Sequence, residues 1–239
     1  MASPMRTSRV HDDPFAPLWV DGLPILYEDE EEGEMGEANL HVLWTQTLHY
    51  GLMAHLAYRP ELRVYSNMNL YYRDAPLHPK TRSRPYVSPD VMVVEPFTPL
   101  PDDLVSYTIG REGPAPLLAS EVLSERSTQQ RDLKEKLPLY ARLGVKEYVQ
   151  ADPVGRFLPQ RLVIHRLQTD GSWLTARDPD GGITSDLQFR VILESNNQLR
   201  LQNTVTGRLY VRPEEADLRV REMEAELANL KKSRRRKGR

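Results

Sequence analysis

Two carboxylates stand inside apolar segments of this sequence and are its strongest candidates for chemistry. Asp90 opens the run Asp-Val-Met-Val-Val, and Glu121 lies within Leu-Leu-Ala-Ser-Glu-Val-Leu at 117–123. An ionised carboxylate is costly to bury, so such residues are usually exposed at a strand end, paired, or bound to metal. Asp90 can simply cap a strand end, whereas Glu121 alternates with Leu117 and Leu123 and so belongs to a buried face.

Carboxylates that converge from neighbouring strands provide the oxygen ligands that Mg²⁺ prefers, and such a metal lowers the pKa of bound water. Phosphodiester hydrolysis uses that arrangement and benefits from a cation beside it. Lys134 and Lys136 follow on a predicted helix, where Lys136 is four residues after Asp132 and four before Tyr140, so these three share a face. The alternative is an exposed helical ion pair, worth about 0.3–0.5 kcal/mol.

A second pair of polar residues, Glu37 and His41, is spaced four apart at the start of a predicted helix. Glu37 can be an acid favoured by the positive helix N-terminus, with His41 a hydrogen-bonded interface histidine. The other histidines are scattered along the chain and predict no zinc site. The absence of cysteine excludes disulfides, thiolate zinc sites and cysteine nucleophiles.

Hydrophobic periodicity predicts the elements that must position these residues. Pro138 falls inside a predicted helix and either kinks it or marks a new start at its first turn. Residues 96–116, with five prolines and two glycines, are predicted to be a long connection. The predicted elements are a helix over 37–57, strands over 62–73, 90–95, 117–123 and 146–151, a helix over 127–143, short antiparallel strands over 160–211, and a helix with apolar residues spaced four and three apart at Ala216, Val220, Met223, Leu227 and Leu230.

The charge distribution is uneven along the 239 residues. Residues 231–239 carry seven Lys/Arg and no acid, which leaves 25 basic and 34 acidic side chains in the rest, a net charge of −9. Non-specific nucleic-acid affinity comes mainly from neutralised phosphates, so any DNA contact must be local or use this tail. The tail can also be merely a solvated terminal charge run.

Several classes of protein are disfavoured by what the sequence lacks. It contains no Gly-rich phosphate loop and no Gly-x-Ser-x-Gly element, which removes the usual support for kinases, dehydrogenases and triad hydrolases. It also contains no apolar run long enough for a signal peptide or a membrane span. With the absence of cysteine, this predicts a cytoplasmic protein without a membrane partner.

An ordered series of motifs over residues 35–153 resembles the Uma-type putative restriction endonuclease family, which is placed in the PD-(D/E)XK nuclease superfamily. The resemblance implies that Asp90 is the Pro-Asp aspartate and Glu121 the glutamate of the Glu-x-Lys element. Position 123 is Leu instead of the superfamily's lysine. The resemblance implies that Lys136 replaces it, that Glu37 assists the metal site, and that Mg²⁺ or Mn²⁺ is the cofactor. The motifs are Pro89-Asp90-Val-Met-Val-Val, Glu121-Val-Leu-Ser124, Ser127-Thr128, Asp132-Leu-Lys-Glu-Lys136, Tyr140, Gly144-Val-Lys-Glu-Tyr148 and Asp152-Pro153.

The expected fold is α/β, with a restriction-endonuclease-like core in which helices flank a central mixed β-sheet, followed by a C-terminal antiparallel β extension and a terminal helix. The expected segments are an extended acidic lead-in at 1–36, the core at 37–153, the β extension at 154–212 and an amphipathic helix with a basic tail at 213–239.

Three functional hypotheses follow. The first is a Mg²⁺-dependent DNA endonuclease in which Asp90 and Glu121 hold the metal, Lys136 acts on the attacking water and the developing charge, and Glu37 assists. The second is a catalytically inactive nucleic-acid-binding or regulatory protein on the same fold, because fold does not determine function. The third is an assembly module that works through the C-terminal helix and the β extension, and the partner expected through that helix is a second copy of the chain.

Overall fold

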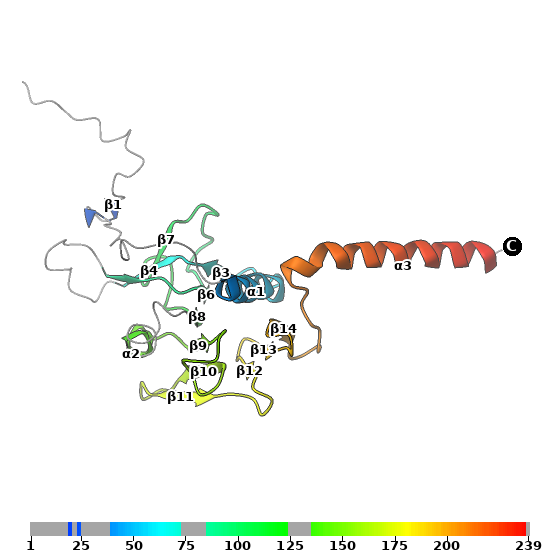
Figure 1. The fold of residues 1–239 in the computed structure, drawn as a ribbon. Helices are drawn as coiled ribbons and strands as arrows, with labels where there is room; N and C mark the ends of the chain where they lie inside the picture. The colour runs from blue at the N-terminus through cyan, green and yellow to red at the C-terminus, as the bar shows by residue number, and fades with distance from the viewer. Residues whose placement is uncertain (1–18, 21–22, 25–38, 73–84, 124–134, 238–239) are drawn as a thin grey trace, which may run out of the picture.

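The computed structural model describes residues 19–20, 23–24, 39–72, 85–123 and 135–237, and its centre is a six-stranded sheet (Figure 1). The strand order is β11-β10-β9-β8-β6-β3. Only β8 and β9 pair in parallel, so the sheet is mixed. Its strands are β3 (Arg63–Ser66), β6 (Val91–Val94), β8 (Leu118–Val122), β9 (Glu147–Ala151), β10 (Leu162–Leu167) and β11 (Trp173–Ala176).

The two faces of this sheet carry separate apolar clusters. Helix α1 (Asn39–His55) buries Trp44, Leu48 and Leu52, which recur every four residues, in one cluster with Val91, Val93, Leu118 and Val122. Helix α2 (Lys136–Leu143) belongs to the other cluster, where Tyr140 packs with Met92, Ala119 and Tyr148. Alternate residues of β6 and β8 therefore face opposite helices.

Two three-stranded sheets flank this core. One has the order β5-β4-β7, and the other, antiparallel, has the order β12-β13-β14 and packs on α1. The contact between α1 and β14 is close at Gly51, where a Cβ atom would lie 2.9 Å from Leu201 Cδ2. The strands are β4 (Asn69–Tyr71), β5 (Tyr86–Val87), β7 (Ser106–Thr108), β12 (Ile183–Thr184), β13 (Phe189–Leu193) and β14 (Leu199–Asn203).

The remaining elements lie towards the chain ends. Strands β1 (Trp19–Val20) and β2 (Leu23–Pro24) pair with each other. A short 3-10 helix, η2 (Pro213–Glu215), leads into α3 (Ala216–Lys237), which extends away from the sheets (Figure 1). None of the helices in the described part of the chain has the length and apolar composition needed to cross a bilayer.

The predicted fold class is confirmed: helices flank a central mixed sheet, and an antiparallel sheet and a terminal helix follow it. Pro138 lies in the first turn of α2, which begins at Lys136 in the described residues.

The prediction of one strand over residues 62–73 is wrong. Asn67 has a φ of 50° and divides the segment into β3 and β4, which belong to different sheets. The Asn67 N–H and the Ser66 hydroxyl both donate to the Asp90 carbonyl, at 3.2 and 2.8 Å. Asparagine tolerates the left-handed conformation better than most residues, and apolar alternation does not reveal such a break.

The prediction of residues 96–116 as a connection without structure of its own also needs correction. This segment contains β7, which pairs in parallel with β4. Tyr107 of this strand is fully buried, and its hydroxyl donates to the Pro114 carbonyl at 2.9 Å. The flanking prolines concealed a strand whose backbone partner is distant in sequence.

Candidate active site

Glu121 is a carboxylate near the end of the buried strand β8 (Leu118–Val122), with only 2% of its surface exposed. Its neighbours Leu118 and Val122 face α1, whereas Ala119 belongs to the cluster of α2. By strand alternation Glu121 shares the face of Ala119 and points towards α2. Because an isolated charge is costly at such a position, partners must compensate it.

Helix α2 supplies these partners from successive turns. The Tyr140 hydroxyl donates to Glu121 Oε1 at 2.7 Å, and Lys136 Nζ lies 2.9 Å from Glu121 Oε2. Lys136 and Tyr140 are four residues apart, so one helical face presents both groups. The side chains of Lys136 and Glu121 are 12% and 3% exposed, so this is a buried ion pair and not the exposed helical pair that the sequence left open.

Tyr140 remains a hydrogen-bond donor at any physiological pH. Burial, and next the charge of Glu121, raise the pKa of its hydroxyl well above its usual value, with smaller contributions from Tyr148 and Asp90. A neutral phenol that donates to one carboxylate oxygen fixes the orientation of the carboxylate.

Asp90 lies opposite Glu121 at the entry of β6. Val91 pairs with Ser120 in antiparallel strands. Asp90, one residue before Val91, therefore lies beside Glu121, one residue after Ser120. The Val122 N–H donates to Asp90 Oδ2 at 2.6 Å, and His41 Nε2 lies 3.7 Å from Asp90 Oδ1. The structure therefore brings Asp90, Glu121 and Lys136 together around one end of two adjacent strands.

These residues fit a divalent cation by the chemistry of their donors. Mg²⁺ commonly takes one or two carboxylates and completes its shell with water and phosphate oxygens. A carboxylate offers about four lone-pair positions, so a carboxylate that accepts hydrogen bonds can also bind a metal. Among the described residues no group of three His, Asp or Glu side chains is placed to hold a metal ion.

Other predicted site residues fall outside the described part of the chain. Glu37, the candidate third acid, and Lys134, the alternative lysine, both lie there, as does Asp132. His41 is described and lies close to Asp90, so the helix start that the sequence singled out does approach the site.

A buried polar row, which no sequence pattern predicted, continues from Glu121 across the sheet. Gln150 is the register partner of Glu121 on β9, and its Oε1 lies 3.0 Å from His165 Nε2. The other ring nitrogen of His165 is 2.8 Å from the Thr175 hydroxyl. The glutamine within the otherwise apolar run Tyr148-Val-Gln150-Ala could have indicated a buried polar contact. Nothing in the sequence around His165 indicated that it takes part.

Burial lowers the pKa of His165 to about 4, so its ring is neutral at pH 7. A neutral imidazole has one donor and one acceptor. Because Gln150 Oε1 accepts, Nε2 carries the proton and Nδ1 accepts from Thr175. The row thus ties β9, β10 and β11 together beside the carboxylate pair.

The fold and site define a mixed α/β protein with a lysine-paired carboxylate site at the ends of two sheet strands. The family model of Uma2, described as "Putative restriction endonuclease", matches residues 34–208, and the chain belongs to this family. No curated protein matches. A crystal structure of a protein from Anabaena variabilis, described as a putative nuclease, is similar with a TM-score of 0.45 and 14% identity, over 70% of this chain and 80% of that one.

Proposed function

We propose that this protein is a Mg²⁺-dependent endonuclease that hydrolyses phosphodiester bonds of DNA. The observation that carries the proposal is the buried contact of Lys136 with Glu121, next to Asp90 on the adjacent strand. Two carboxylates that meet at one site repel each other, and a divalent cation between them offsets that repulsion. The family description adds support, since it names restriction endonucleases.

In this proposal Asp90 and Glu121 hold the cation. When bound, Mg²⁺ polarises the phosphoryl group and makes a bound water a better nucleophile. The Val122 N–H fixes Asp90, and the Tyr140 hydroxyl fixes Glu121, so both carboxylates are oriented before substrate binds.

Lys136 has the role that acts on the reaction itself. Hydrolysis forms a bond from a water oxygen to phosphorus and breaks the bond to a sugar oxygen, and negative charge grows on the phosphoryl oxygens. The ammonium group beside Glu121 can stabilise that charge and hold the attacking water. Its contribution therefore appears in the transition state more than in the ground state.

DNA capture is assigned to the C-terminal basic residues. The body has a net charge of −9 without them, and α3 carries residues 231–237 away from the sheets (Figure 1). Phosphate contacts of this kind give affinity without sequence preference. We propose that residues 231–239 supply much of the non-specific affinity for DNA.

Nicking of supercoiled plasmid tests the proposed activity. We expect cleavage that requires Mg²⁺ or Mn²⁺ and disappears in Asp90→Ala. Glu147→Gln is the matched control, because Glu147 is also a buried carboxylate of this sheet, 3% exposed, but pairs with Arg166 and lies against Ser185. Its variant should still cut.

Calorimetry separates the metal site from the activity. Titration with Mg²⁺ or Mn²⁺ should give heat with the wild type and Glu147→Gln, and none with Glu121→Gln. If the wild type and Asp90→Ala bind DNA equally and neither cuts with any divalent metal, the inactive nucleic-acid-binding alternative replaces this proposal.

A further inference from the structure

Helix α3 carries a seam of apolar side chains that are about half exposed or more. The side chains of Val220, Met223, Leu227 and Leu230 are 48%, 51%, 52% and 61% exposed. They are spaced three, four and three residues apart, which aligns them along one side of the helix. This is the spacing of the core positions of a two-stranded coiled coil.

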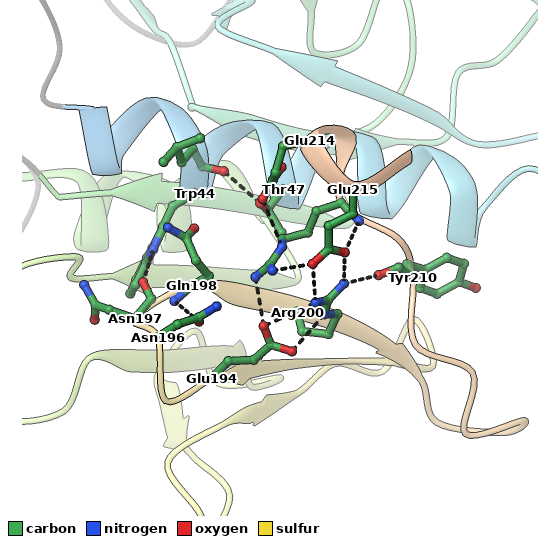
Figure 2. A network of polar contacts seen from close by, with 12 residues as sticks. Trp44, Thr47, Glu194, Asn196, Asn197, Gln198, Arg200, Tyr210, Glu214 and Glu215 are labelled. Atoms are coloured by element: carbon green, nitrogen blue, oxygen red, sulfur yellow. Dashed lines mark hydrogen bonds and ion pairs between the residues drawn. The ribbon is translucent and has the colours of Figure 1, made fainter. Parts of the chain in front are cut away.

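The base of α3 is fixed to the body by a network of charged side chains, which Figure 2 shows from close by. Arg200 of β14 hydrogen-bonds Glu194 at 2.9 Å and Glu215 at 2.8 Å. Arg212 contacts Glu194 at 2.8 Å and Glu214 at 3.0 Å. Hydrogen bonds from Arg200 lower the pKa of Glu215 to about 2, so Glu215 is ionised at pH 7.

This network holds the N-terminal end of α3, and the helix points away from the sheets (Figure 1). The first seam residue, Val220, lies about one turn after the helix begins at Ala216. The seam therefore lies on the part of α3 that extends beyond the sheets.

We infer that this partner is α3 of a second copy of the chain, packed parallel and in register. In a parallel pair, each residue directly before an a position faces the partner residue five positions further on. With Val220 and Leu227 at a, Arg219 faces Glu224 of the second copy and Glu226 faces Lys231 of the second copy. Both contacts join opposite charges, and symmetry doubles them.

The antiparallel arrangement lacks this complementarity. If Val220 packs opposite Leu230 and Met223 opposite Leu227, the flanking positions at the centre bring Glu224 against Glu224 and Glu226 against Glu226. Four acids then meet at the middle of a short seam. Val220 at a and Leu230 at d are residue types that favour two strands in a parallel coiled coil.

A parallel pair brings the two basic C-terminal segments to one end and the two sheet bodies to the other. The inference is independent of catalysis, because it uses no residue of the candidate active site. It describes how two chains, each with one candidate active site, are arranged in a dimer.

Disulfide trapping in the full-length protein tests the orientation without background, because the chain has no cysteine. In a parallel, in-register pair the two copies of residue 223 face each other, at a separation that suits the Cα distance of about 4.4–6.8 Å in disulfides. We expect Met223→Cys to give a covalent dimer under mild oxidation. Ala225→Cys, on the outer side of the helix, should give much less.

Two results would overturn the arrangement. One is a Met223→Cys protein that stays monomeric, or that cross-links no better than Ala225→Cys. The other is a disulfide that forms only when Met223→Cys and Leu227→Cys proteins are mixed, which identifies the antiparallel pair.

The mass in solution tests the seam, with Leu218 as a matched control because it is 62% exposed on the same helix but lies off the seam. Sedimentation over a concentration series should show the wild type and Leu218→Ser approaching twice the 27.5 kDa monomer. Leu227→Ser should remain near the mass of one monomer. Equal behaviour of the two variants would contradict the role of the seam.

Charge exchange tests the flanking contacts. Glu226→Lys and Lys231→Glu should each reduce dimer formation, because each places like charges together, and the double variant should restore it. These two positions are five apart and do not face each other within one helix, so restoration must come from the partner. A double variant as weak as the single ones would refute the parallel register.

Discussion

Replacing Lys136 by methionine tests how Glu121 is held in the sheet. The ammonium group lies 2.9 Å from Glu121 Oε2, which corresponds to a gross attraction of about 6 kcal/mol at an effective dielectric constant of about 20. Much of this is offset, because methionine costs less to bury than lysine, and the bond from Tyr140 remains. Loss of one partner from a buried pair costs about 3–5 kcal/mol, and we expect the lower end of that range.

The assay is urea unfolding followed by tryptophan fluorescence at pH 7, without divalent metal. A loss of about 3 kcal/mol corresponds to roughly 6–12 °C in melting temperature for a chain of this length. A difference below about 1 kcal/mol would show that the ion pair contributes little to holding Glu121.

Magnesium extends the same experiment to the proposed site. A bound cation replaces the missing ammonium charge, so Mg²⁺ should stabilise Lys136→Met more than it stabilises the wild type. At 100 times the dissociation constant the gain is about 2.7 kcal/mol. The variant should nevertheless be strongly impaired in cleavage. No gain with Mg²⁺ in either protein, or the same gain in Glu121→Gln, would refute a metal site at this carboxylate.

Three further predictions concern other parts of the chain. Tyr140→Phe removes one hydrogen bond to the buried Glu121 and should cost about 1.5–3 kcal/mol in urea unfolding, with little change in overall structure. Because burial lowers the folded-state pKa of His165 to about 4, its unfolded form binds a proton first as pH falls. Wild-type stability should therefore decline between about pH 6.5 and 4, by up to about 3 kcal/mol, and unfolding of His165→Gln should lack that part of the decline. Changing Arg234, Arg235 and Arg236 to serine should weaken DNA binding and flatten its salt dependence by up to about 2.7 in logarithmic slope, at roughly 0.9 per lost phosphate contact; an unchanged slope would remove the tail from DNA capture.

The sequence predicted those parts of the site that depend on local periodicity. Strand alternation placed Glu121 on a buried face, and helical spacing placed Lys136 and Tyr140 on one side of their helix. Neither pattern could show that the helix lies over that strand. The ion pair follows from packing between segments that share the cluster of Met92 and Tyr148.

The parts that the sequence did not predict depend on non-local pairing. β3 ends before Asn67, whose N–H donates to the Asp90 carbonyl, and β7 forms a strand because it pairs with β4. Gln150 lies beside Glu121 because the two residues are register partners. In each case a distant backbone partner determines the local structure, and periodicity in a single segment contains no information about that partner.

The absence of a lysine at position 123 changes which elements the site depends on. Leu123 is buried, with 2% of its surface exposed, and the ammonium group beside Glu121 belongs to Lys136 of α2. A lysine on β8 would keep its place through the strand alone, whereas Lys136 needs α2 held in one orientation. The Trp173 indole N–H donates to the Leu137 carbonyl at 3.0 Å, one residue after Lys136. Strand β11 at the sheet edge thereby helps to position the cation, so the C-terminal strands support the carboxylate site as well as completing the sheet.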